Sequence, residues 1–79
     1  MTNPETIARF LVDEVGVRSP LEHDEDLLAS DQLDSQGMME LVAFIEESFA
    51  IEVGDEDLVP DNFKSVGAIA GFVARKQGG

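Results

Sequence analysis

An apolar stripe at helical spacing runs through the middle of the chain and most restricts how it can fold. Its members recur at positions i, i+3, i+4, i+7 and i+11, with acidic residues between them: Met38, Leu41, Val42, Ile45 and Phe49. Side chains at this spacing share one face of an α-helix. The sequence therefore predicts an amphipathic helix over about residues 36–49, whose apolar face must be buried against other elements.

Packing alone has to stabilise this chain. It has 79 residues and no cysteine, so no disulfide can compensate for a small core. A chain of this length forms one small domain. Its Leu, Ile, Val and Phe residues are too numerous for a disordered chain. We expect a single domain over residues 1–79, with a helical core over about 4–76 and a flexible tail at 77–79.

Two further helices are expected on either side of the central one. Asn3 and Pro4 are typical of a helix start, and Gly16 is typical of a helix end. These signals predict a first helix over about residues 4–15. Ser65 is a typical N-cap, and it precedes an apolar segment that ends in basic residues, as the helix dipole prefers.

The connections are expected to be a long loop and a short helix. Residues 17–34 lack a clean period, and an acidic cluster at 22–26 favours a loop whose leucines contact the core: Leu21, Leu27, Leu28 and Leu33. The acidic residues 55–57 suit the start of a short helix, which Pro60 would end. The predicted fold is all-α, a small four-helix bundle with three principal helices, one short helix and a long first loop.

The charge of the chain excludes several classes of partner. The formal net charge is -12 at pH 7, which repels nucleic acids and anionic membrane surfaces. No apolar run approaches the ~20 residues of a membrane span. Residues 1–5 lack the basic and apolar regions of a secretory signal. We therefore expect a cytoplasmic protein that binds neither nucleic acid nor membrane.

Acidic residues are concentrated in the centre of the chain. Fourteen of them lie between Glu22 and Asp61, whereas no Lys or Arg occurs between Arg18 and Lys64. Such a segment is either a solvated surface that maintains solubility or a docking face for basic partners, steered by charge and weakened by salt. Both interpretations stay open at this point.

Ser35 is the candidate functional residue because it is expected at the N-cap of the central helix. A phosphate attached to its hydroxyl would meet the positive end of the helix dipole. The simpler interpretation is a cap that contributes ~1 kcal/mol to the helix. A hydrolase would need His23 to reach Ser35, and the Gly-x-Ser-x-Gly elbow is absent. The cluster at 22–26 also lacks the spacing of a calcium loop, so neither a catalytic nor a metal site is expected.

The surroundings of Ser35 resemble a known family. The run Leu-Asp-Ser-Gln-Gly-Met-Met-Glu-Leu-Val at 33–42 and the segment that follows it to residue 53 are similar to acyl, peptidyl and aminoacyl carrier proteins. The resemblance covers about residues 5–75. Its most specific part is an Asp-Ser pair that opens a Glu-rich amphipathic helix after a long loop.

This resemblance implies that Ser35 carries a covalent 4′-phosphopantetheine derived from coenzyme A, making the chain a phosphoprotein. The terminal thiol would hold an acyl or aminoacyl group as a thioester. The chain would be a monomeric tether and no enzyme, served by a phosphopantetheinyl transferase, a loading enzyme and a downstream synthase or transferase. The implied docking face for these partners consists of Asp34, Gln36, Met39, Glu40, Ala43, Glu46 and Glu47.

Two residues depart from the pattern of many fatty-acid carriers, which have leucine and then an acid after the serine. Here Gln36 and Gly37 follow Ser35. A residue followed by glycine after the serine resembles D-alanyl carriers and discrete carriers that load amino acids or unusual extender units. Gly37 costs about 1 kcal/mol relative to alanine in a helix, or it lets a prosthetic group or partner approach the backbone. The resemblance thus favours a specialised pathway of the polyketide or nonribosomal peptide type. The alternatives are housekeeping fatty acid synthesis and an unmodified acidic helical interaction module.

Overall fold

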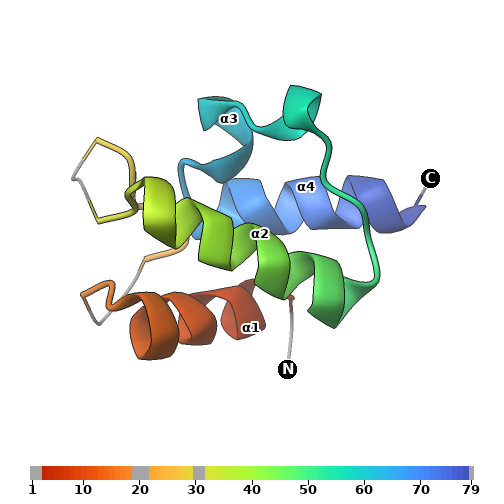
Figure 1. Cartoon of the computed structure of the whole chain (residues 1–79). Helices are drawn as coiled ribbons and strands as arrows, with labels where there is room; N and C mark the ends of the chain where they lie inside the picture. Colours follow the sequence, from red (N-terminus) through yellow and green to blue (C-terminus); the bar gives the residue numbers. More distant parts are fainter. Residues whose placement is uncertain (1–2, 19–21, 30–31, 79) are drawn as a thin grey trace.

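The computed structural model describes residues 3–18, 22–29 and 32–78, and helices dominate it (Figure 1). The long helices are α1 (Asn3–Phe10), which continues as the π-helical segment η1 (Leu11–Val15), α2 (Ser35–Phe49) and α4 (Val66–Gly78). The 3-10 turn η2 (Asp55–Asp57) and the short helix α3 (Pro60–Phe63) lie between α2 and α4. The described ranges contain no strand. The predicted all-α fold, a small four-helix bundle, is confirmed.

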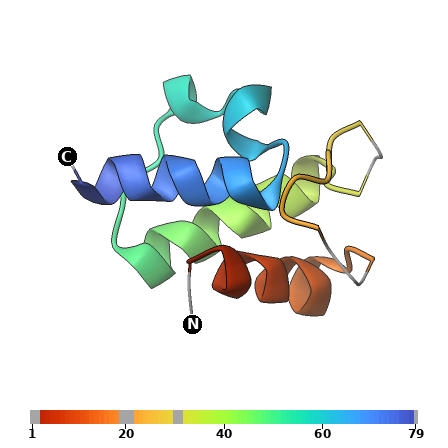
Figure 2. The same ribbon diagram turned by 180° about the vertical axis from the view of Figure 1, so that it is seen from behind.

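The helices α2 and α4 occupy the middle of the molecule, with α1 on one side and α3 on the other in both views (Figures 1 and 2). Helix α4 contacts α1, α2 and α3, and α2 also contacts η1. The fully buried side chains of the core come from every one of these helices and from the first loop: Ile7, Leu11, Leu27, Leu41, Ile45, Phe63, Val66, Ile69 and Val73. The predicted helical faces therefore meet in one core.

The first helical stretch ends where the sequence predicts. Gly16 has φ 94°, a left-handed conformation that favours glycine, and its N–H donates to the Leu11 carbonyl at 2.9 Å. Helix α1 begins at Asn3, one residue before the expected start. The prediction of a helix over about 4–15 is therefore confirmed, with a wider π-helical turn at its end.

The loop between η1 and α2 is held against the core by two buried leucines. Leu27 and Leu33 are buried and Leu28 is half-buried, as predicted, while Leu21 lies outside the described residues. The Leu27 N–H donates to the Lys64 carbonyl at 2.6 Å. This contact ties the loop to the junction between α3 and α4.

Pro60 begins a helix, so the expectation that it ends one is wrong. The segment that opens at Asp55 stops at Asp57 as a single 3-10 turn, and Leu58 and Val59 follow outside any helix. Pro60 then takes the first position of α3. Proline suits this position because its fixed φ is helical and its missing N–H would have no acceptor there.

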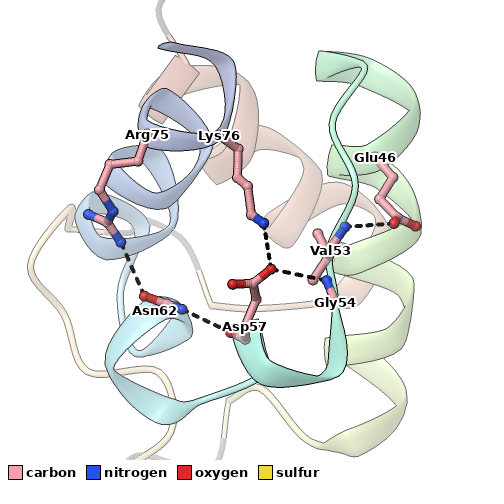
Figure 3. Close-up of polar contacts among 7 residues, drawn as sticks. All are labelled: Glu46, Val53, Gly54, Asp57, Asn62, Arg75 and Lys76. Carbon is pink, nitrogen blue, oxygen red and sulfur yellow. Dashed lines mark hydrogen bonds and ion pairs between the residues drawn. The ribbon is translucent and has the colours of Figure 1, made fainter. Parts of the chain in front are cut away.

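Polar contacts of Asp57 join η2 to α4, and Asn62 adds α3 to the same network (Figure 3). The Lys76 ammonium lies 2.7 Å from the Asp57 carboxylate, which also accepts the Gly54 N–H at 3.0 Å. The Asn62 side chain donates to the Asp57 carbonyl at 2.9 Å and accepts from Arg75 at 3.2 Å. Because α3 has only four residues, this network contributes to its position.

Helix α4 is capped as predicted and is longer than predicted. The Ser65 hydroxyl accepts the Ala68 N–H at 3.1 Å, which confirms Ser65 as the cap. The helix continues through Gly78, beyond the expected end at 76. Gln77 donates from its side chain to the Phe49 carbonyl at 3.4 Å, which connects this last turn to the end of α2. Of the expected tail at 77–79, Gly79 lies outside the described residues.

Candidate functional site

Ser35 is an exposed residue in the first position of α2, directly after its cap. The cap is Asp34, whose backbone is extended (φ -93°, ψ -175°) and whose Oδ1 accepts the Gly37 N–H at 2.8 Å. The expectation that Ser35 itself caps the helix is therefore wrong by one residue. The carboxylate takes the first-turn N–H that a serine hydroxyl would otherwise take. Capping consequently does not explain why a serine occupies position 35.

A shallow, mainly apolar hollow of about 320 Å³ lies beside Ser35. Met39 is 73% exposed, whereas Met38 is half-buried. The other lining residues come from the first loop and the cap, so the full set is Leu28, Leu33, Asp34, Ser35, Met38 and Met39. The serine therefore lies at the border between apolar surface and solvent.

Gly37 is closely surrounded by other side chains inside the protein. It is buried, and a Cβ at this position would lie 3.0 Å from Val15 Cγ1 and 3.2 Å from Leu33 Cδ1. Such distances are shorter than ordinary van der Waals contacts. The close approach that the structure shows at Gly37 is thus to η1 and the first loop.

Six of the seven expected docking residues are exposed at the start of α2 or along it, and Glu46 differs. Glu46 is half-buried, and its carboxylate accepts the Val53 N–H at 2.9 Å (Figure 3). This contact holds the segment that follows α2. The exposed residues are Asp34, Gln36, Met39, Glu40, Ala43 and Glu47.

Part of this exposed face forms one wall of a groove between α2 and the first helical stretch. Two half-buried phenylalanines lie in the groove: the rings of Phe10 and Phe44 stack with centroids 4.1 Å apart and planes 13° from parallel. The lining residues are Phe10, Glu14, Glu40, Ala43, Phe44 and Glu47, which we call the α1–α2 groove. The sequence patterns did not single out Glu14 or Phe44.

His23 and Ser35 line different hollows. His23 is exposed in the first loop and lies beside Lys64 and Ser65 at the beginning of α4, where its carbonyl accepts the Gly67 N–H at 2.8 Å. Within residues 3–18, 22–29 and 32–78, no three His, Cys, Asp or Glu side chains gather as metal ligands would. These observations give no geometric support to a hydrolytic site.

The ion pair between Asp57 and Lys76 shifts the titration of both groups. The hydrogen bond from Lys76 is the largest cause that lowers the pKa of Asp57, and the Gly54 N–H lowers it further. The same hydrogen bond raises the pKa of Lys76. This pair joins η2 to α4 and lines none of the hollows beside Ser35.

No protein-family model matches the chain. In the part of the chain that the structure describes, no helix has the length and apolar character needed to cross a membrane.

Proposed function

We propose that the chain is a carrier protein whose Ser35 hydroxyl bears a covalent 4′-phosphopantetheine. The observation that carries this proposal is the position of Ser35. It is an exposed serine at the first residue of α2, it follows an aspartate that already caps the helix, and apolar surface lies beside it. The hydroxyl is thus accessible to a modifying enzyme.

The start of α2 suits a phosphodiester on this hydroxyl. The N–H groups of Ser35 and Gln36 belong to the first turn, where no intrahelical acceptor exists. Together with the helix dipole they favour a negative group at this end. The Asp34 carboxylate neutralises part of this effect, and its Oδ1 accepts the Gly37 N–H at 2.8 Å.

The residues around Ser35 have separate roles in this proposal. Asp34 fixes the beginning of α2 and therefore the place of the hydroxyl. Leu28, Met38 and Met39 supply apolar surface beside the attachment point. When attached, the prosthetic group supplies a terminal thiol that can hold an acyl or aminoacyl group as a thioester. This accounts for thiol chemistry on a chain without cysteine.

The proposed partners are a phosphopantetheinyl transferase, a loading enzyme and a downstream synthase or transferase. Exposed residues around Ser35 are available to them, among them Gln36, Met39 and Glu40. The pathway is proposed to be specialised, of the polyketide or nonribosomal peptide type. This part of the proposal is supported by the Gln36–Gly37 pair after Ser35, because a residue followed by glycine at this place resembles discrete carriers.

The test is an intact-mass measurement after incubation with coenzyme A, magnesium and a permissive phosphopantetheinyl transferase. We expect one phosphopantetheine to be added to the parent chain and none to Ser35→Ala. Ser48→Ala is the matched control, because Ser48 is a second exposed serine of α2, and it should be modified like the parent. Modification of Ser35→Ala would show that the site is wrong.

The second candidate is an unmodified interaction module that binds basic partners through charge. It is favoured by the exposed acidic residues of α2, such as Glu40 and Glu47. This candidate predicts no mass change on a folded sample and a salt-sensitive affinity for basic partners that is the same in the parent and in Ser35→Ala.

A further inference from the structure

We propose that the α1–α2 groove binds a basic segment of a partner protein, with one apolar side chain of that segment lying against Phe10 and Phe44. The groove extends beyond the face of α2 that the resemblance implies, because Phe10 and Glu14 come from the first helical stretch. Its use depends on the proposed carrier function, since a carrier must meet partner proteins. Binding in the groove does not itself require Ser35.

The floor of the groove is aromatic and only partly covered. Phe10 and Phe44 stack at 4.1 Å, and Phe49 contacts Phe44 edge-on with centroids 6.4 Å apart. Phe10 and Phe44 are both half-buried, in contrast to the fully buried Phe63 of the core. An apolar anchor that covers such rings is the usual source of affinity at the centre of a protein interface.

The rim of the groove is acidic. Glu14, Glu40 and Glu47 are exposed, and none of them forms an ion pair with the described residues. One basic residue, Arg9, lines an adjoining hollow together with Asp13 and with Phe10, Glu14 and Phe44 of the groove, where acidic residues still outnumber it. Lys or Arg side chains flanking an apolar anchor would therefore complement both the rim and the floor.

Charge also argues against other occupants. The chain carries a formal net charge of -12, so a second copy would bring like charges into the groove. Nucleic acids would be repelled in the same way. A basic protein segment is the occupant that gains from both the aromatic floor and the carboxylates.

The groove continues towards Ser35. Glu14 and Glu40 border the α1–α2 groove and also the next hollow, which Asp34 and Gln36 line together with Val15 and Gly37. These two glutamates thus form a common border between the aromatic floor and the residues on either side of Ser35. A partner that binds the groove is therefore brought to the end of α2 at which Ser35 lies.

Ala43 allows the groove to be blocked without disturbing the core. It is exposed on the α2 wall, so Ala43→Lys adds a long cationic side chain there and removes no buried contact. Ala74→Lys is the matched control. Ala74 is an exposed alanine of α4, and its replacement changes the net charge by the same amount.

The probe is a synthetic amphipathic helical peptide with lysines on one face and one tryptophan among leucines on the other. It is titrated into the unmodified protein and followed by amide chemical shifts. We expect the largest shifts at the groove residues. We expect roughly ten-fold weaker binding for Ala43→Lys, and a much smaller loss for Ala74→Lys, which reports only the general attraction.

Three outcomes would overturn the proposal. They are equal losses of peptide affinity in the two variants, the largest chemical-shift changes on α3 or α4, or chemical-shift changes that track self-association of the protein when it is diluted. Each is independent of the mass measurement on Ser35. Failure of the groove can therefore be separated from failure of the carrier function.

Discussion

The Asp34 carboxylate accepts the Gly37 N–H at 2.8 Å, and the same oxygen lies 3.3 Å from the point where a Cβ on Gly37 would be. The aspartate of the Asp-Ser pair thus has a structural task, because it begins α2 immediately before Ser35. The missing Cβ of Gly37 leaves room for Val15, whose Cγ1 would lie 3.0 Å from a Cβ at this position. The start of the helix and the place of the candidate serine therefore depend on two residues that are not themselves modified.

Replacing Asp34 separates its capping role from its charge. We expect Asp34→Ala to lower the free energy of unfolding by about 1 kcal/mol, because the Gly37 N–H loses its acceptor. Asp34→Asn should stay close to the parent, since asparagine is an equally good cap. Urea unfolding followed by circular dichroism measures both. An unchanged midpoint in Asp34→Ala would contradict the capping role.

The same pair of variants also informs the modification reaction. If Asp34 acts only by positioning Ser35, the transferase should modify Asp34→Asn at the parental rate and Asp34→Ala more slowly. Slow modification of both variants would show that the transferase recognises the negative charge itself.

Alanine should have opposite effects at two helical glycines. At Gly37 the new Cβ would lie 3.0 Å from Val15 Cγ1, and overpacking costs about 1–3 kcal/mol, more than the helix propensity gained. We expect a net loss of about 1 kcal/mol. At Gly71 the nearest atom is the end of Arg75, 3.7 Å away, so Gly71→Ala should gain about 0.5–1 kcal/mol. Stabilisation by Gly37→Ala would show that Val15 moves aside at little cost.

Local signals in the sequence were sufficient for the helices but not for every boundary. The apolar stripe around Leu41 and Ile45 predicted α2, because a buried face must recur at helical spacing. The cap was ambiguous, since Asp34 and Ser35 are both good capping residues and only the backbone decides between them. Pro60 was ambiguous in a similar way, because proline is compatible with the position after a helix and with the first position of one.

The groove could not be predicted from the sequence because it depends on how two helices pair. Phe10 and Phe44 lie 34 positions apart in the sequence, and no periodicity connects them. Glu46 illustrates the same limit. In the sequence Glu46 and Glu47 are equivalent members of the acidic face. In the structure the chain turns back after α2 and brings the Val53 N–H to the Glu46 carboxylate. Residue type and spacing predicted which face is acidic, whereas tertiary contacts decide which acids are available.

The ion pair of Asp57 and Lys76 should make stability depend on pH at both extremes. Because the folded state lowers the pKa of Asp57, this contribution is complete above the ordinary pKa of an aspartate and is lost as the pH falls below about 4. Because the folded state raises the pKa of Lys76, its contribution is complete at neutral pH and is lost as the pH rises beyond about 10.4.

Asp57→Asn tests this dependence when it is compared with Asp24→Asn, an exposed loop variant with the same change of charge. The difference in unfolding free energy between the two variants should be constant from about pH 5 to 9 and shrink outside that range. The effect is expected to be small because the pair lies at the surface. Acid also relieves the general repulsion among carboxylates, but both variants share that effect. A difference that does not change between pH 3 and pH 6 would show that the Lys76 contact contributes nothing to the pH dependence of folding.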